Sequence, residues 1–439
     1  MISRQYSGSP EDVRAMLSRS IGSIVDNVQC YVKDPVSDMS RCRKLPPEKV
    51  LKILLSMGGS ALKTEICSLL PEGEEVQSSA FCMQRYKFTL EAFVRLFNLF
   101  TSSVSLSETF NGFTIIATDG SDINIPFDPD DQDTLVKGIK GARDHSAYHL
   151  NALYDVLTGI YYDIHVSTPS KTEEVGSLLR MAERHLYPSG SVIVGDRGYV
   201  SYKAMATFNE SGQKYVIRSK DIDCPSSILH RHGLPAAEFD RTVTVSLTRS
   251  NVLYKSNPSS YALVTSSSDF PFLKSYDRGT YELTFRVVRF MLDNGCYESL
   301  VTNLSEKEMP LEAMKDLYHL RWNEETSFRT LKYNLGLVSF HSKKREGILQ
   351  EMYCRLVMFN AASAIIGGIE VSRKDGSKYD VSANRAVAIT NVKLFLRGLL
   401  SASGLISRIK KYLVPVRPGR SYGRKIRTQS ARPFYYRLS

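Results

Sequence analysis

The stretch from Tyr318 to Lys332, YHLRWNEETSFRTLK, constrains the fold of this chain more than any other. At about 100° per residue, an unbroken helix places four of its polar residues within an arc of roughly 60°, namely Tyr318, Arg321, Glu325 and Lys332. An apolar stripe at offsets of three and four runs beside that arc, through Leu317, Leu320, Phe328, Leu331 and Leu335. The pattern predicts one helix that faces the core and carries a phenol, two cations and a carboxylate on its margin. The alternative is an ordinary amphipathic helix with an i,i+4 ion pair on its solvated flank.

The length of 439 residues leaves room for two or three domains, and the composition is that of a globular protein. No apolar run approaches the roughly 20 residues that span a bilayer, and the N-terminus lacks a secretion-signal pattern. Seven cysteines are scattered without a Cys-x-x-Cys pair, which predicts neither a disulfide framework nor a zinc site. We therefore expect a cytoplasmic protein without a membrane partner.

The positive charge is concentrated at the C-terminal end. Residues 371–439 contain 16 Lys and Arg against two acids, Asp375 and Asp380, a net +14. The preceding 370 residues therefore carry a net −3 of the total of +11. This asymmetry predicts a polyanionic partner for the tail, most simply nucleic acid. A solvated basic tail without a specific ligand is the alternative.

The secondary-structure pattern of the sequence changes along the chain. Residues 1–105 read as helices, which fits a helical DNA-binding region but also any small helical bundle. Residues 106–219 alternate short β-branched runs with helical patterns, which predicts a mixed α/β sheet. Residues 220–304 are rich in β patterns and predict an inserted β subdomain. Residues 305–370 contain the helix of the opening paragraph and a second apolar helix, and 371–439 form a basic region for DNA binding or dimerisation.

Two aspartates share one context, because each follows a buried β-branched run and precedes small residues. FTIIATD is predicted to end at Asp119, where Gly120-Ser121 turns the chain, and SVIVGD is predicted to end at Asp196. Ligands bind at such strand ends in open α/β sheets, although a lone aspartate there is often a turn former or a helix cap. Together with Glu325, the pair predicts three carboxylates in one cleft. These repel one another unless a cation neutralises them, and hard oxygen ligands favour Mg²⁺ or Mn²⁺.

These residues resemble a known family. TDGS at 118–121, GDRGY at 195–199 and Tyr-x2-Arg-x3-Glu-x6-Lys at 318–332 look like the DDE transposases of the IS4 family of bacterial insertion sequences. The last pattern matches that family's YREK signature without a gap, and the resemblance covers roughly residues 75–370. It implies an RNase H-like fold, in which three antiparallel strands are followed by helix-crossed parallel ones. A β-rich insertion then interrupts the sheet before the glutamate helix, with helical regions at both ends of the chain.

The resemblance also implies roles for individual residues. Asp119, Asp196 and Glu325 match the catalytic metal-binding triad, which implies two Mg²⁺ or Mn²⁺ ions per active site. The phenol and the two cations of the signature match residues that contact phosphates near the transposon end, namely Tyr318, Arg321 and Lys332. The spacing selects Glu325 over its neighbour Glu324, which falls amid the apolar stripe.

Several residues have two open interpretations. Arg197 and Tyr199 either touch DNA or brace their loop, and Trp322 either stacks on an unpaired base or packs beside its helix. The acidic run DPDDQD at 128–133 lacks the spacing of an EF-hand loop, so a solvated loop is favoured over a calcium site. His145 and His149 read as structural or DNA-adjacent residues.

The implied reaction is nicking at the ends of an insertion sequence, then joining of the 3′-hydroxyl to target DNA, with a hairpin intermediate as in several relatives. The implied partners are terminal inverted repeats, target DNA and a second copy of the chain, on the bacterial nucleoid. The rival predictions are an RNase H-like nuclease without strand joining and a catalytically silent DNA-binding derivative. A glycoside hydrolase is disfavoured, since a single tryptophan and a basic tail do not suit a sugar cleft.

Overall fold

The computed structural model describes residues 2–5, 8–41, 44–104, 106–138, 143–230, 232–265, 268–274, 279–292, 295–371 and 378–416. Within these ranges the backbone alone is described for Ile2–Gln5, Ser107, Trp322, Asn323 and Glu325. Of the predicted basic region 371–439, residues 372–377 and 417–439 therefore lie outside the described residues.

A ten-stranded mixed sheet organises the described part of the chain, in the order β10-β9-β11-β12-β8-β7-β3-β5-β4, with β6 paired to β5. Its strands are β3 (Ile115–Ile125), β4 (Leu135–Val136), β5 (His145–Asp155), β6 (Tyr161–Ser167), β7 (Val192–Gly195), β8 (Lys214–Ser219), β9 (Phe239–Thr248), β10 (Tyr261–Leu263), β11 (Thr280–Met291) and β12 (Tyr297–Thr302).

The middle of this sheet has RNase H-like topology. Strands β3, β5 and β6 are antiparallel neighbours, while β7 pairs parallel with β3 and β8 pairs parallel with β7. Helices α6 (Glu174–Arg184) and α7 (Tyr202–Ser211) connect the parallel strands. Three antiparallel strands followed by helix-crossed parallel ones is the predicted arrangement, and the predicted fold class is confirmed.

Strand β3 corrects one prediction. The chain does not turn at Gly120-Ser121, because β3 continues to Ile125 and pairs with β5 from Ile116 to Ile125. Asp119 therefore lies within the strand and not at its end. The sequence after Asp119 alternates polar residues with Ile123 and Ile125, both buried, so the long partner strand and the buried face outweigh the turn preference of glycine and serine.

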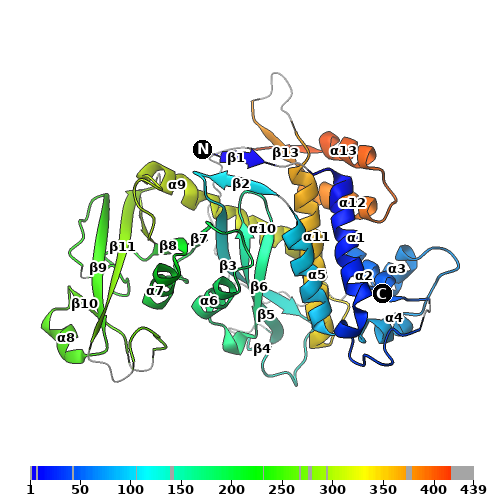
Figure 1. Cartoon of the computed structure of the whole chain (residues 1–439), viewed down its shortest axis with the longest axis horizontal. Helices are drawn as coiled ribbons and strands as arrows, with labels where there is room; N and C mark the ends of the chain where they lie inside the picture. The colour runs from blue at the N-terminus through cyan, green and yellow to red at the C-terminus, as the bar shows by residue number, and fades with distance from the viewer. Residues whose placement is uncertain are drawn as a thin grey trace.

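The strands of the β-rich segment 220–304 extend this same sheet. β12 pairs with β8 from Ser299 opposite Ser219, and β11 and β9 continue the sheet outward. Figure 1 shows these strands at one end of the molecule and the N-terminal helices at the other. Among the described residues of 220–304 there is one helix, the short α8 (Asn251–Ser256), which the sequence analysis does not predict.

Helices cover both faces of the sheet. α6 and α7 pack on one face with residues such as Ile116 and Ile193. A larger core on the other face includes Ile115 and Val194. Its helices are α1 (Pro10–Asp26), α2 (Pro47–Ser56), α3 (Leu62–Leu69), α4 (Ser78–Arg85), α5 (Leu90–Ser103), α9 (Leu311–Leu320), α10 (Trp322–Tyr333), α11 (Arg345–Gly367), α12 (Arg385–Leu396) and α13 (Ala402–Lys411).

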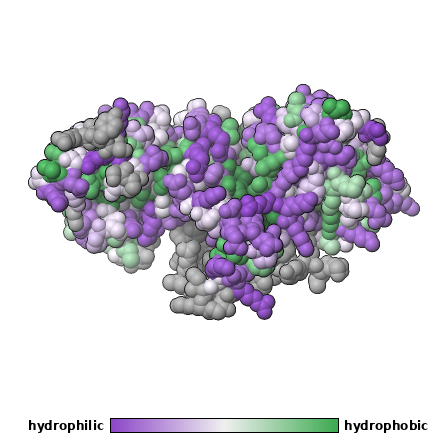
Figure 2. Space-filling view, turned by 90° about the horizontal axis from the view of Figure 1, so that it is seen from below, coloured by the Kyte–Doolittle hydropathy of each residue, from purple (hydrophilic) through white to green (hydrophobic). Residues whose placement is uncertain are grey.

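Shorter elements complete the fold. They are the strand pairs β1 (Ile2–Gln5) with β2 (Ser107–Phe110) and β13 (Val381–Ala383) with β14 (Leu413–Pro415), and the 3-10 turns Val28–Tyr31 and Pro169–Lys171. None of the helices within the described ranges combines the length and apolarity needed to cross a bilayer. The six cysteines in those ranges are free thiols. Figure 2 shows a face that is mostly hydrophilic, with hydrophobic side chains in small areas among the polar ones.

A buried charge network fixes the N-terminal helices to α11. Arg85 of α4 donates to the carboxylate of Glu351 at 3.0 Å and to the Gly347 carbonyl at 2.8 Å, and its side chain is 1% exposed. Glu351 also accepts from the backbone N–H of His341 at 2.9 Å and lies 3.4 Å from Arg355. The N-terminal region therefore shares its core with the rest of the chain.

Replacing Glu351 by Gln is expected to destabilise the protein by about 3–5 kcal/mol, because Arg85 and Arg355 lose the charge that compensates them in the interior. Urea unfolding measures this loss. Glu48→Gln is the matched control, since Glu48 pairs with Lys52 on the surface and should contribute less than about 1 kcal/mol. Equal losses for both variants would contradict the structural role of the buried network.

The same carboxylate predicts a pH dependence. Burial alone raises the pKa of Glu351, but the hydrogen bond from His341 and the charges of Arg85 and Arg355 outweigh it, so the pKa lies below its ordinary value of 4.5. A depressed folded-state pKa gives stability that is present above pH 4.5 and is lost as the pH falls below it. In urea titrations, the difference between the wild type and Glu351→Gln should shrink below pH 4.5. A difference that grows there would contradict this assignment.

Candidate active site

The pairing of β3 with β7 brings the two predicted aspartates together. The strands run parallel in a register that ends with Thr118 opposite Gly195. Asp119 is the next residue of β3, and Asp196 is the residue that directly follows β7. Neighbouring strands lie about 4.8 Å apart, so these aspartates are lateral neighbours although 76 positions separate them in the sequence.

Both aspartates belong to the same face of the sheet. Side chains alternate between faces along a strand, so Asp119 shares its face with Ala117. The same alternation, continued one residue past the end of β7, gives Asp196 the face of Val194. Ala117 and Val194 both belong to the core that includes α9, α10 and α11. Two partly exposed carboxylates therefore lie on the sheet face that these helices cover.

A third residue extends this row. Gly195 pairs with Ile217 on β8, so the position opposite Asp196 is Arg218. Its Nη1 lies 3.6 Å from Oδ1 of Asp196, and its Nε lies 3.1 Å from Oε1 of the buried Glu298 on β12. We call Asp119, Asp196 and Arg218 the lateral row. The sequence analysis missed Arg218, although its place after the run KYVI, in the strand next to SVIVGD, could have marked it.

The segment of α9 and α10 crosses the lateral row. At one end, the hydroxyl of Tyr318 donates to Oδ1 of Asp196 at 3.5 Å. At the other end, Nζ of Lys332 donates to Oγ of Ser121 at 2.8 Å and to the carbonyl of Asp122 at 2.7 Å. Arg321 lies between them, buried, with its guanidinium 5.5 Å from the centre of the Tyr318 ring. The described residues of the signature thus meet the sheet at β7 and at β3.

The prediction of one unbroken helix from Tyr318 to Lys332 is wrong. Helix α9 ends at Leu320 and α10 begins at Trp322. Between them the backbone makes i→i−3 hydrogen bonds, from Arg321 N–H to Tyr318 O at 3.2 Å and from Glu324 N–H to Arg321 O at 3.0 Å. Such a tighter turn changes the helix phase, so the predicted arc of 60° holds only for positions 325 and 332 within α10.

The acidic positions of α10 differ in what the structure describes. Glu324 is fully buried, in agreement with its predicted place amid the apolar stripe. Glu325 and Trp322 lie in α10, and their side chains are outside the described part of the chain. Among the described side chains, no group of three or more His, Cys, Asp and Glu could hold a metal ion. The donor chemistry of Asp119 and Asp196 nevertheless fits a hard divalent cation, because two adjacent carboxylates repel each other without one.

Comparison with known families gives a match over most of this region. A family model described as "Transposase DDE domain" matches residues 111–361, more than half of the chain. The chain belongs to this transposase family. No curated protein matches. Among solved structures, the chain is similar to one described as "Cryo-EM structure of piggyBac transposase synaptic complex with hairpin DNA", with 10% identity, a TM-score of 0.47, and coverage of 96% of this chain and 89% of that one.

In this transposase, two side chains pack closely against Gly195, the last residue of β7. A Cβ on Gly195 would lie 3.2 Å from both Thr118 and Tyr199. The Tyr199 side chain is buried and its hydroxyl donates to Asn151 at 2.8 Å, which favours bracing over DNA contact. Arg197 is exposed, so it keeps both interpretations.

Electrostatics at the β3 end of the site depend on Lys332. Burial lowers the pKa of its amine, while the carboxylates of Asp122 and Asp119 oppose that shift. Asp122 also accepts from the ring of His149 at 2.7 Å, and this hydrogen bond is the largest cause that lowers the pKa of Asp122. His149 is therefore held by the neighbouring strand, in line with its structural interpretation.

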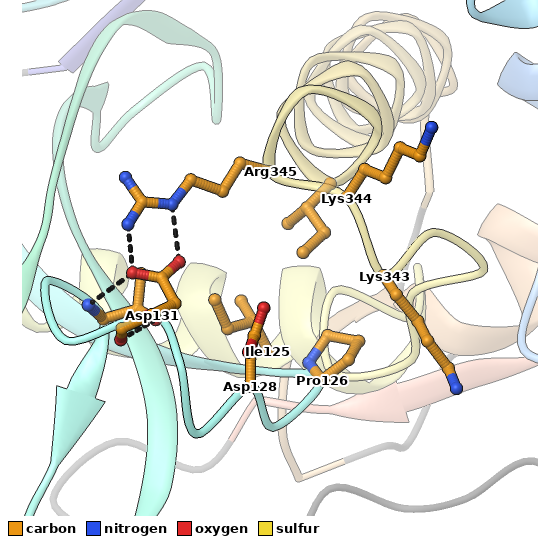
Figure 3. A pocket seen from close by; sticks show the side chains of 9 residues that line it. Ile125, Pro126, Asp128, Asp131, Lys343, Lys344 and Arg345 are labelled. Carbon is orange, nitrogen blue, oxygen red and sulfur yellow. Dashed lines mark hydrogen bonds and ion pairs between the residues drawn. The ribbon is translucent and has the colours of Figure 1, made fainter.

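The acidic run at 128–133 is tied down and not simply solvated. Figure 3 shows the guanidinium of Arg345 turned toward Asp131, while Lys343 and Lys344 point away. Nε of Arg345 donates to Asp131 at 2.5 Å, and its Nη2 lies 3.4 Å from Asp133. Asp131 and Arg345 border a cavity of about 460 Å³ at the end of β3, together with Lys343 and Lys344. The pairing joins the loop after β3 to the start of α11.

Gly120→Ala is expected to destabilise this transposase by about 1–3 kcal/mol, because the new Cβ would lie 2.4 Å from Nε2 of His149 and 3.2 Å from Asn151. Thermal or urea unfolding measures the loss. Gly59→Ala is the control, since nothing lies within 4 Å of its Cβ position. The close-packing interpretation is wrong if the two variants have the same stability.

Proposed function

We propose that this chain is a DDE transposase of the IS4 type, which cuts at the ends of an insertion sequence and joins them to target DNA by a cut-and-paste mechanism. The observation that carries the proposal is the place of Asp119 and Asp196, each one position past the end of the β3–β7 register, beside the segment that bears Tyr318 and Lys332. Membership of the transposase family supports the reaction class. The YREK spacing and both aspartate motifs support the finer assignment.

Asp119, Asp196 and Glu325 would hold two Mg²⁺ or Mn²⁺ ions, with Glu325 assigned from its spacing in the signature. When bound, such ions activate a water or a 3′-hydroxyl and stabilise the leaving oxygen of an in-line displacement at phosphorus. The chain's own residues set the geometry. The β3–β7 register fixes the two aspartates laterally, and Tyr318 holds one oxygen of Asp196.

The cations of the signature would bind the DNA backbone beside this centre. Lys332 lies at β3, two and three residues past Asp119, through its contacts with Ser121 and Asp122. A lysine there offers a point charge to a phosphate, and an arginine offers a bidentate fork. Arg321 and the exposed Arg197 are further candidates, while Trp322 is a candidate for base stacking.

The proposed partners are terminal inverted repeats, target DNA and a second copy of the chain. The basic residues of 371–439 would add salt-sensitive affinity without sequence preference. A hairpin intermediate is part of the proposal. The β-rich insertion contains no tryptophan, so a flipped base would be held differently from relatives that use one there.

The decisive experiment is Mg²⁺-dependent cleavage of a candidate DNA end by the wild type and by Glu325→Gln. The variant should bind the end with unchanged affinity and cut at least 100-fold more slowly, because it keeps the fold but loses one carboxylate of the triad. Gel-based cleavage and fluorescence anisotropy measure the two quantities. Equal cutting by both proteins would remove the metal-triad assignment.

A second assay separates the rival functions. Pre-cleaved ends supplied with a target plasmid should give joined product, which a nuclease of the same fold does not make. A catalytically silent DNA-binding derivative would give neither cleavage nor joining.

A further inference from the structure

Arg218 and Glu298 form a charged pair that the proposed chemistry does not use. The Glu298 side chain is 8% exposed and lies 3.1 Å from Nε of Arg218. A buried carboxylate needs such a partner, because removing it from water is unfavourable without one. Leu300 of β12 lies opposite Arg218, and Glu298, two residues away, shares that face of the strand. The pair is therefore fixed by the pairing of β8 with β12.

Within this pair, the Arg218 guanidinium is the cation that faces Asp196. Nη1 of Arg218 lies 3.6 Å from Oδ1 of Asp196, the same oxygen that accepts from the Tyr318 hydroxyl at 3.5 Å. The Arg218 side chain is 27% exposed and that of Asp196 is 37% exposed, so solvent and ions reach both. A divalent ion bound to Asp196 would meet this positive charge at close range.

We propose that Arg218 is the resident counter-cation of Asp196 in the metal-free protein, anchored by Glu298, and that divalent ions compete with it for that carboxylate. Arg218 is thus a positioning residue that restrains metal loading at the site. The inference rests on the proposed function, since it takes Asp196 as a metal ligand. It assigns a role in metal affinity to two residues outside the triad and the YREK signature.

The test is direct binding of Mn²⁺ to the full-length protein without DNA, followed by electron paramagnetic resonance. Arg218→Gln should bind Mn²⁺ roughly tenfold more tightly, since a screened unit charge within about 4 Å of a ligand carboxylate is removed. Arg218→Lys keeps the charge and should stay near the wild-type affinity. Unchanged or weaker binding by Arg218→Gln would overturn the proposal.

A double variant guards against misfolding, because Arg218→Gln leaves the buried Glu298 without its cation. Arg218→Gln with Glu298→Gln replaces the ion pair by two amides, and its affinity for Mn²⁺ should also exceed that of the wild type. The matched control is Arg184→Gln with Asp163→Asn. This pair has a 2.8 Å contact, a 7% exposed carboxylate, and a place on α6 and β6 away from the lateral row. The control should leave Mn²⁺ affinity unchanged, and tighter binding by it would overturn the proposal.

Failure of the proposed function has a different signature. Asp119→Asn and Asp196→Asn should each weaken Mn²⁺ binding in an otherwise wild-type chain. If neither does, the carboxylates are not metal ligands and the proposed function fails at its base. If both do and Arg218→Gln binds no more tightly, only the counter-cation proposal fails.

Discussion

Two like charges on neighbouring parallel strands are the constraint on which this structure depends. Asp119 lies in β3 and Asp196 directly follows β7, each one position past the last pair of the parallel register, Thr118 opposite Gly195. Their repulsion has to be offset by positive charge. Arg218 supplies it from the next strand, and Lys332 supplies it from α10. β8 and α10 therefore place cations beside the two aspartates of the lateral row.

The support for that site comes from distant parts of the chain. α9 and α10 are held at two points. Tyr318 of α9 donates to Asp196, just past β7, and Lys332 of α10 donates to Ser121 of β3. The loop that follows α10 contains His341, which is bonded to Glu351 of α11, and Glu351 is in turn paired with Arg85 of α4. The N-terminal helices are thus part of the scaffold that supports α9, α10 and α11. Through these contacts they help to fix the segment that crosses the lateral row.

The sequence predicted what depends on local pattern. The β-branched run SVIVGD became β7, and the β-rich segment 220–304 became strands β9–β12. What it missed depends on tertiary context. Gly120-Ser121 reads as a turn, but a long partner strand keeps it extended. The break at Arg321 leaves the apolar periodicity intact, so no pattern marks it. Arg345 and Asp131 are 214 residues apart, and no local sequence pattern predicts their pairing.

The continuity of the sheet across β8 and β12 has a consequence for protein engineering and for evolution. Residues 220–304 look like an insertion that could be removed without affecting the rest of the chain. In this chain, however, β12 satisfies the outer edge of β8. Excising the segment would leave that edge as an open template for another molecule's strand, which invites aggregation. A chain shortened in this way would need another segment to pair with β8. The deletion would also remove Glu298, the buried carboxylate that anchors Arg218.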